Sequence, residues 1–125
     1  MGNSYTQKTL KALRDSGAVT GIVEHWNPFD HKRHDLFGFI DIIAMFIPKG
    51  GEDGAVCAVQ STGPSGHMDH KRKILAEPRA LIWLKSGGTI QLWSWRKLLV
   101  KRGGKARRWV QRVEHITEDM FDGED

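Results

Sequence analysis

The sequence predicts an α/β fold, in which a sheet is covered by helices on at least one face. Two observations lead to this prediction. Apolar segments at 36–46 and 55–62 are rich in residues that favour strands and are separated by a polar, glycine-rich connector. Segments of helical and of alternating pattern lie on either side of them. With 39% apolar and 27% charged residues, the 125-residue chain fits a single domain over 1–125 with a modest core at about 4–116.

A helix and a strand are expected before these segments. Leu10 and Leu13 give residues 4–16 the apolar stripe of a helix. Residues 18–26 favour a strand, and a charged loop at 31–35 follows.

The two apolar segments predict a β-hairpin that closes about Gly50-Gly51. In that register, residues whose numbers sum to 101 face each other, so Asp41 lies opposite Gln60. These two residues are polar interruptions of otherwise apolar strands. Burying an acid beside an amide is costly unless something binds them, so the pair is the main functional signal in the sequence.

Two helices and a second hairpin are expected after the central hairpin. Residues 67–77 have a helical pattern, and a second short helix at 78–85 begins with a proline. Residues 89–95 and 108–116 alternate and should pair. An acidic tail at 117–125 is expected to form a short turn or to fray.

The composition indicates a cellular setting. The chain has one cysteine, Cys57, which excludes an internal disulfide framework and fits a reducing cytoplasm. No apolar run approaches the roughly 20 residues of a membrane span. We therefore expect a cytoplasmic protein without a membrane partner.

A first candidate site comprises Glu24, Asp41, Gln60 and Thr62. Gln60 and Thr62 are two residues apart, so both side chains project from one face of their strand. Carboxylate and amide oxygens suit Mg²⁺, which could polarise a phosphate and activate water. The competing interpretation is a polar pair satisfied within the sheet, with no metal.

This region resembles the PD-(D/E)XK nuclease superfamily, and more narrowly its small phage and bacterial Holliday-junction-resolvase-like and VRR-NUC-like members. The resemblance covers roughly residues 4–85. It is based on a helix followed by a Gly-Phe-Ile-Asp motif that ends at Asp41 and a Val-Gln-Ser-Thr motif that ends at Thr62. It implies a restriction-endonuclease-like core of helix, three-stranded meander, helix and further strands, here with a C-terminal β-hairpin.

The resemblance also implies roles for individual residues. Asp41 matches the family aspartate, Gln60 the second acid and Glu24 an earlier glutamate, so these three would hold Mg²⁺ or Mn²⁺. Thr62 stands where the family has a lysine. Either a basic residue of the next helix replaces that lysine, or the site is impaired and the domain only binds. The candidates for replacement are Lys71, which we favour, Arg72 and Lys73.

The charge distribution predicts DNA as the partner. The net charge is +4, and residues 96–112 carry many basic side chains and no acid. Trp93, Trp95 and Trp109 lie within or beside this block, and exposed members could stack on bases. A His-x-x-His pattern recurs at 31–34 and 67–70, which is a weak signal for a transition metal. The expected phosphate contacts are Arg33, His67, His70, Lys101, Arg102, Lys105, Arg107 and Arg108.

The sequence therefore favours a metal-dependent DNA endonuclease that hydrolyses phosphodiester bonds. The resemblance implies branched DNA as the substrate and a homodimer as the assembly. The alternative is a catalytically impaired nuclease-fold module that binds DNA. A third hypothesis is an interaction domain that does not bind nucleic acid.

Overall fold

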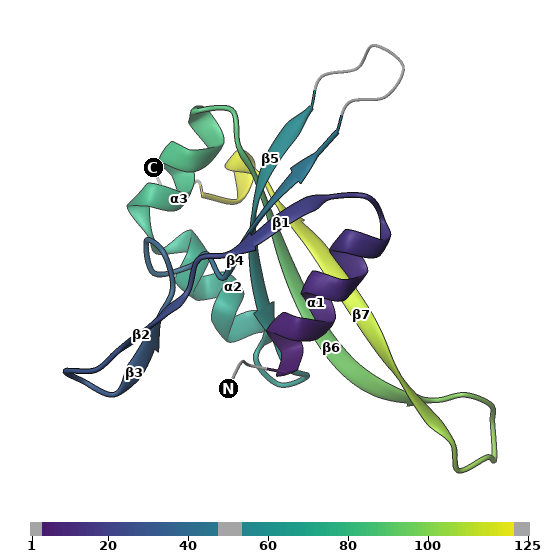
Figure 1. Cartoon of the computed structure of the whole chain (residues 1–125). Helices are drawn as coiled ribbons and strands as arrows, with labels where there is room; N and C mark the ends of the chain where they lie inside the picture. Colours follow the sequence, from purple (N-terminus) through teal and green to yellow (C-terminus); the bar gives the residue numbers. More distant parts are fainter. Residues whose placement is uncertain (1–3, 48–53, 122–125) are drawn as a thin grey trace.

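The computed structural model describes residues 4–47 and 54–121, and it has an α/β architecture with a mixed five-stranded sheet between helices (Figure 1). The strand order is β1-β4-β5-β6-β7. β5 and β6 are parallel, and the other neighbours are antiparallel. The strands are β1 (Val19–Ile22), β4 (Ile42–Phe46), β5 (Ala55–Thr62), β6 (Thr89–Leu99) and β7 (Arg107–Ile116).

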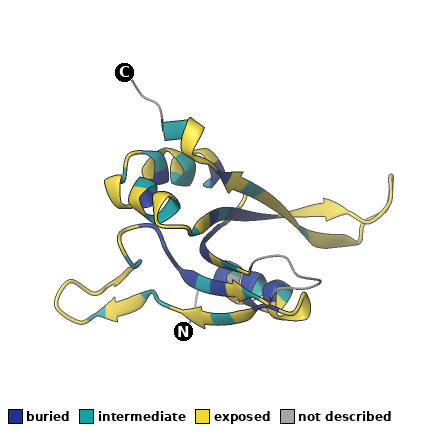
Figure 2. Ribbon diagram, turned by 90° about the horizontal axis from the view of Figure 1, so that it is seen from above, coloured by how far each residue is buried: buried dark blue, intermediate teal, exposed yellow. Residues whose placement is uncertain are grey.

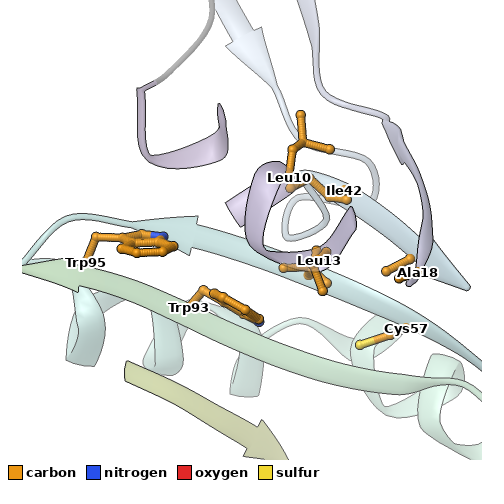
Figure 3. Packing of buried hydrophobic residues seen from close by; sticks show 9 residues of the cluster. Leu10, Leu13, Ala18, Ile42, Cys57, Trp93 and Trp95 are labelled. Atoms are coloured by element: carbon orange, nitrogen blue, oxygen red, sulfur yellow. The ribbon is translucent and has the colours of Figure 1, made fainter. Parts of the chain in front are cut away.

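One face of the sheet is covered by the N-terminal helix α1 (Ser4–Asp15). Leu10 and Leu13, three residues apart, point from this helix onto the sheet and are almost fully buried. Trp93 and Trp95 project from β6 into the same cluster, where Figure 3 shows them beneath the helix. Burial of side chains of this size contributes roughly 2 kcal/mol each to folding.

The other face is covered by α2 (His67–Leu75), α3 (Pro78–Lys85) and the short 3₁₀ helix η1 (Glu118–Phe121). Its core contains buried apolar residues from the helices and from β5, β6 and β7. Figure 2 shows the sheet between its two helical layers, with exposed residues concentrated on two projecting hairpins.

The register predicted for the central hairpin is confirmed. Ile42 lies opposite Val59 and Ile43 opposite Ala58, so the paired numbers sum to 101. Asp41 immediately precedes β4, and its backbone N–H donates to the Val59 carbonyl at 2.9 Å. The turn expected at Gly50-Gly51 lies outside the described residues.

The expectation of one continuous strand over 18–26 is wrong. The chain leaves the sheet after β1 and forms a separate two-stranded hairpin, β2 (His25–Asn27) with β3 (Lys32–His34). The predicted loop at 31–35 therefore contains a strand. A turn at Asn27 and Pro28 reverses the chain there, as Asn-Pro chemistry favours.

The first half of the central hairpin is shorter than predicted, because residues 36–40 fold back on themselves. The Leu36 N–H donates to the Ile40 carbonyl at 3.0 Å, and Phe37 and Gly38 have φ of 55° and 79°. Glycine favours this left-handed conformation, which closes the reversal.

The remaining elements agree with the predictions, with two adjustments. The helix predicted to reach Glu77 ends at Leu75, and the second helix begins at Pro78, as expected. β6 continues to Leu99, four residues past the predicted end. The start of the predicted tail forms a short turn, one of its two expected states, and packs Met120 and Phe121 of η1 against the core; its last four residues lie outside the described part. No helix in the described ranges is long and apolar enough to span a membrane.

Candidate metal centre and nucleic-acid surface

Three carboxylates converge at one end of the sheet. Glu24 lies between β1 and β2, Asp35 follows β3, and Asp41 precedes β4. Each offers one oxygen, and these oxygens all lie within 4.8 Å of one another. The structure thus brings Glu24 and Asp41 together, as predicted, and adds Asp35. We call Glu24, Asp35 and Asp41 the acidic cluster.

The Gln60 side chain points into the acidic cluster, as its predicted position opposite Asp41 requires. Its Nε2 donates to Asp35 Oδ2 at 3.0 Å and approaches Asp41 Oδ2 at 3.4 Å. Gln60 is 2% exposed, and its Oε1 is buried with no hydrogen-bond partner among the described residues. A half-turn of the amide exchanges the two atoms, so the unpartnered oxygen can face the same centre.

The protonation of the acidic cluster reflects the crowding of its charges. Burial and the neighbouring Asp35 raise the pKa of Asp41 to about 9, although the Ser61 N–H donates to Asp41 Oδ2 at 2.8 Å. Burial acts to raise the pKa of Asp35 too, but hydrogen bonds with Asp41 and Gln60 and the charge of Lys73 outweigh it and lower that pKa. Burial and the charge of Asp35 raise the pKa of Glu24. Without a cation, Asp41 is therefore the carboxyl that retains a proton.

Two further unsatisfied groups border the acidic cluster. Thr6 is 1% exposed and lies beside Glu24, where it partly opposes the rise in the pKa of Glu24, yet its Oγ1 is buried without a hydrogen bond of normal geometry in the described structure. His70 has a buried Nδ1 with no partner among those residues, and the charge of Asp35 acts on its ring. Together with Gln60 Oε1, these are all the buried unpartnered side-chain atoms of the described ranges. Such groups are rare in native proteins, and their concentration here indicates a site for water or an ion.

The donor set fits a hard divalent cation. Mg²⁺ and Mn²⁺ prefer oxygen ligands, and here three carboxylates meet beside the Gln60 amide, whose oxygen would join them after the half-turn. Among the described residues this is also the only group of three or more potential His, Cys, Asp or Glu ligands. The histidine patterns at 31–34 and 67–70 do not form a site of this kind.

The lysine beside the acidic cluster is Lys73, whereas the sequence favoured Lys71. Lys73 Nζ lies 3.5 Å from Asp35 Oδ2. Lys71 Nζ instead lies 2.7 Å from Glu114 Oε2 on β7. Arg72 is exposed and pairs with Asp69. Residues two apart on a helix point in nearly opposite directions, so Lys71 and Lys73 cannot serve the same centre.

Thr62, which stands where the family has a lysine, places no charge beside the acidic cluster. It is buried at the end of β5, and its Oγ1 would lie 2.3 Å from a Cβ added at Gly66. The hydroxyl therefore faces the loop that leads into α2, and Gly66 is required there to make room for it.

His67 is not available for the phosphate contact predicted for it. The side chain is 4% exposed, with Nδ1 2.9 Å from Ser94 Oγ and Nε2 2.7 Å from Glu114 Oε1. The network of His67, Lys71, Ser94 and Glu114 joins α2 to β6 and β7. No local pattern indicates this network, because its members lie far apart in the chain.

Two of the predicted phosphate contacts lie near the cluster. His70 is half-buried there, and burial together with the charge of Lys73 lowers its pKa. Arg33 lies on β3, and its positive charge partly opposes the rise in the pKa of Glu24 that burial and Asp35 cause. Both are placed beside the carboxylates, as a contact near a reacting phosphate requires.

The basic residues of the second hairpin form an exposed surface. β6 and β7 extend beyond the sheet, and the predicted basic residues lie on their connection and at the start of β7 (Figure 1). All five are exposed: Lys101, Arg102, Lys105, Arg107 and Arg108.

The three tryptophans near this hairpin divide into two groups. Trp93 and Trp95 are 7% exposed and belong to the core, where Trp95 Nε1 donates to Thr9 Oγ1 at 2.8 Å. Trp109 is 37% exposed, and Lys8 and Lys97 lie 4.6 and 5.1 Å from the centre of its ring. Only Trp109 of these three is available for contact with a base.

Comparison of the chain with protein-family models, with curated proteins and with solved structures found no match.

Proposed function

We propose that this protein is a metal-dependent endonuclease that hydrolyses phosphodiester bonds of DNA, built on a restriction-endonuclease-like core. The observation that carries the proposal is the convergence of Glu24, Asp35 and Asp41 beside the buried Gln60 amide, whose oxygen has no hydrogen-bond partner among the described residues. The element order also supports it, since a helix, a three-stranded antiparallel meander with the β2–β3 hairpin inserted after its first strand, and two further helices precede a parallel strand.

In this proposal the three carboxylates and Gln60 hold Mg²⁺ or Mn²⁺. When bound, such an ion supplies charge stabilisation to the phosphate and lowers the pKa of a ligated water. Asp41 gives up its proton to become a ligand. Arg33 and His70 contact phosphate oxygens, and the basic hairpin holds the DNA backbone.

Lys73 takes the part that the family lysine plays in related nucleases. Its ammonium lies beside Asp35, close enough to orient an attacking water and to offset the charge that develops on the phosphate. Hydrolysis adds the oxygen of that water to phosphorus and breaks one P–O ester bond. The attacking water loses a proton to bulk water, and the departing oxygen takes one from bulk water, so the protons balance.

A DNA-binding module without hydrolysis is the second candidate, and it is favoured by Thr62 in place of the lysine. This alternative has the same fold and the same basic hairpin but no catalysis.

Nicking of supercoiled plasmid and of a labelled four-way junction in Mg²⁺ or Mn²⁺ separates the two candidates. We expect cleavage that a chelator stops and that Asp41→Asn reduces by about 100-fold. Asp15→Asn is the matched control, because Asp15 is exposed on α1 and pairs with Lys11. It should cut like the wild type.

Binding of Mn²⁺, followed by electron paramagnetic resonance, gives a readout besides activity. Asp35→Asn and Asp41→Asn should lose it, and Asp15→Asn should keep it. Undiminished cleavage by Asp41→Asn would overturn the nuclease proposal. DNA binding that depends steeply on salt, with no cleavage in either metal, would establish the binding module.

A further inference from the structure

The β2–β3 hairpin, residues 25–34, is directly bounded by two residues of the acidic cluster. Glu24 precedes it and Asp35 follows it, and His25 pairs with His34 as its first rung. The hairpin contributes no buried residue to either core cluster. Figure 1 shows it projecting from the sheet on the side opposite the tip of the β6–β7 hairpin. Whatever binds this hairpin is therefore held next to the candidate metal centre.

Two aromatic side chains are exposed on the hairpin. Phe29 at the tip is 93% exposed, and Trp26 is 53% exposed. The turn that carries Phe29 is closed, since Asn27 Oδ1 accepts from the Phe29 N–H at 2.8 Å and the Asn27 carbonyl accepts from the His31 N–H at 2.9 Å. Phe29 is thus presented outward by a defined turn, which lowers the entropic cost of using it as a wedge.

The charge around these aromatics matches a polyanion. The hairpin carries Lys32, Arg33 and three histidines. Its only acid is Asp30, whose Oδ2 lies 2.7 Å from His34 Nε2. Exposed aromatic rings on a basic ribbon are the combination with which proteins stack on bases or insert between them.

We propose that the β2–β3 hairpin recognises duplex DNA with an interrupted base stack, such as a bulge or a nick, by inserting Phe29 at the interruption. This inference rests on the proposed function, because it takes DNA as the substrate. Trp26 and the cations of the hairpin contact the adjoining strand. Glu24 and Asp35 at the base of the hairpin then lie close to a phosphate at a fixed spacing from the inserted ring.

The length of the hairpin limits that spacing. Phe29 lies five positions after Glu24, so at about 3.3 Å per residue the Cα atoms of the two residues are at most about 17 Å apart. At about 3.4 Å per nucleotide along a strand, cleavage should fall within about five nucleotides of the interruption.

The test compares binding to a duplex with one bulged base, carrying 2-aminopurine beside the bulge, and to the fully paired duplex, with Ca²⁺ in place of Mg²⁺. The wild type should prefer the bulged duplex and change the 2-aminopurine fluorescence. Phe29→Ala should lose about ten-fold in affinity for the bulged duplex and little for the paired one. Phe29→Trp should restore the preference. Ile82→Ala, which removes another exposed apolar side chain on α3, is the control and should behave as the wild type.

Failure of this inference is distinguishable from failure of the proposed function. Loss of bulge preference in Phe29→Ala with unchanged Mn²⁺ binding supports the inference even if no variant cuts DNA. Equal binding of both duplexes by the wild type and by Phe29→Ala overturns it, even if the wild type is an active nuclease. Anionic phosphatidylserine vesicles test the other partner that an aromatic, basic hairpin could fit. Phe29-dependent vesicle binding without a bulge preference would also overturn the inference.

Discussion

The Lys73 ammonium lies 3.5 Å from the carboxylate of Asp35, across 38 positions of the chain. Lys71, which the sequence favoured for this role, instead lies beside Glu114. The two lysines of one helix therefore have separate tasks. One faces the acidic cluster, and the other ties α2 to β7.

Substitution of each lysine by methionine separates these tasks. Lys73→Met should reduce metal-dependent cleavage by about 100-fold, because the charge beside the attacked phosphate is lost, while stability changes little. Lys71→Met should leave cleavage within about three-fold but lower the unfolding free energy by about 1 kcal/mol, since it removes a partner of the half-buried Glu114. Plasmid nicking and urea denaturation measure the two effects. A larger loss of cleavage in Lys71→Met would contradict this assignment.

In the metal-free protein, the stability of the Asp41→Asn variant relative to the wild type should increase as pH rises. Asp41 has a pKa of about 9 in the folded state against an ordinary value of 3.8, so the folded chain keeps a proton that the unfolded chain loses. The contribution of Asp41 to stability therefore falls between about pH 4 and pH 9. The amide of the variant imitates the protonated acid and avoids this loss.

The measurement is urea unfolding of the wild type and Asp41→Asn at pH 5 and pH 8 in the presence of a chelator. Other groups titrate in this range, so the difference between the two proteins is the informative quantity. It should grow in favour of the variant at pH 8. A difference that is constant with pH would show that Asp41 is ionised in the metal-free fold.

Binding of Mn²⁺ should release close to one proton per ion at pH 7. A cation at the acidic cluster needs Asp41 as a carboxylate, and that proton must leave when the ion binds. Calorimetric titrations in buffers of different ionisation enthalpy count the protons. The apparent affinity should rise with pH up to about 9, and Asp41→Asn, which should not bind the ion, should show neither a heat of binding nor proton release. Binding that is independent of pH would place the ion elsewhere.

The central hairpin was predictable because strand pairing has a period of two and the glycine-rich connector suggested where the chain turns. Together these two features predict that Asp41 faces Gln60. The pairing pattern does not place Glu24, which the candidate site includes as a second carboxylate and which the family resemblance matches to an earlier glutamate.

Asp35 could not be placed in the same way, because its position depends on the reversal at 36–40. Phe37 adopts φ of 55° there, a conformation that a phenylalanine gives no local reason to expect. An observation that could have suggested Asp35 is that it directly adjoins the apolar segment containing Asp41. The choice between Lys71 and Lys73 could not be predicted either, because a helical pattern does not indicate which side of an exposed helix lies beside a distant carboxylate.

The exposed hairpin tip should determine how DNA affinity depends on salt. Each phosphate contact that a cation makes contributes about −0.9 to the slope of log K against log salt on duplex DNA. Arg102→Gln should therefore reduce that slope by about 0.9, and the triple substitution of Lys101, Arg102 and Lys105 by about 2.7. Lys85→Gln is the control, because Lys85 lies on α3 and pairs with Glu118. Fluorescence anisotropy with duplexes of unrelated sequence gives the slopes, and affinity should weaken by the same factor on each duplex. An unchanged slope in the triple variant would show that the DNA does not bind along this hairpin.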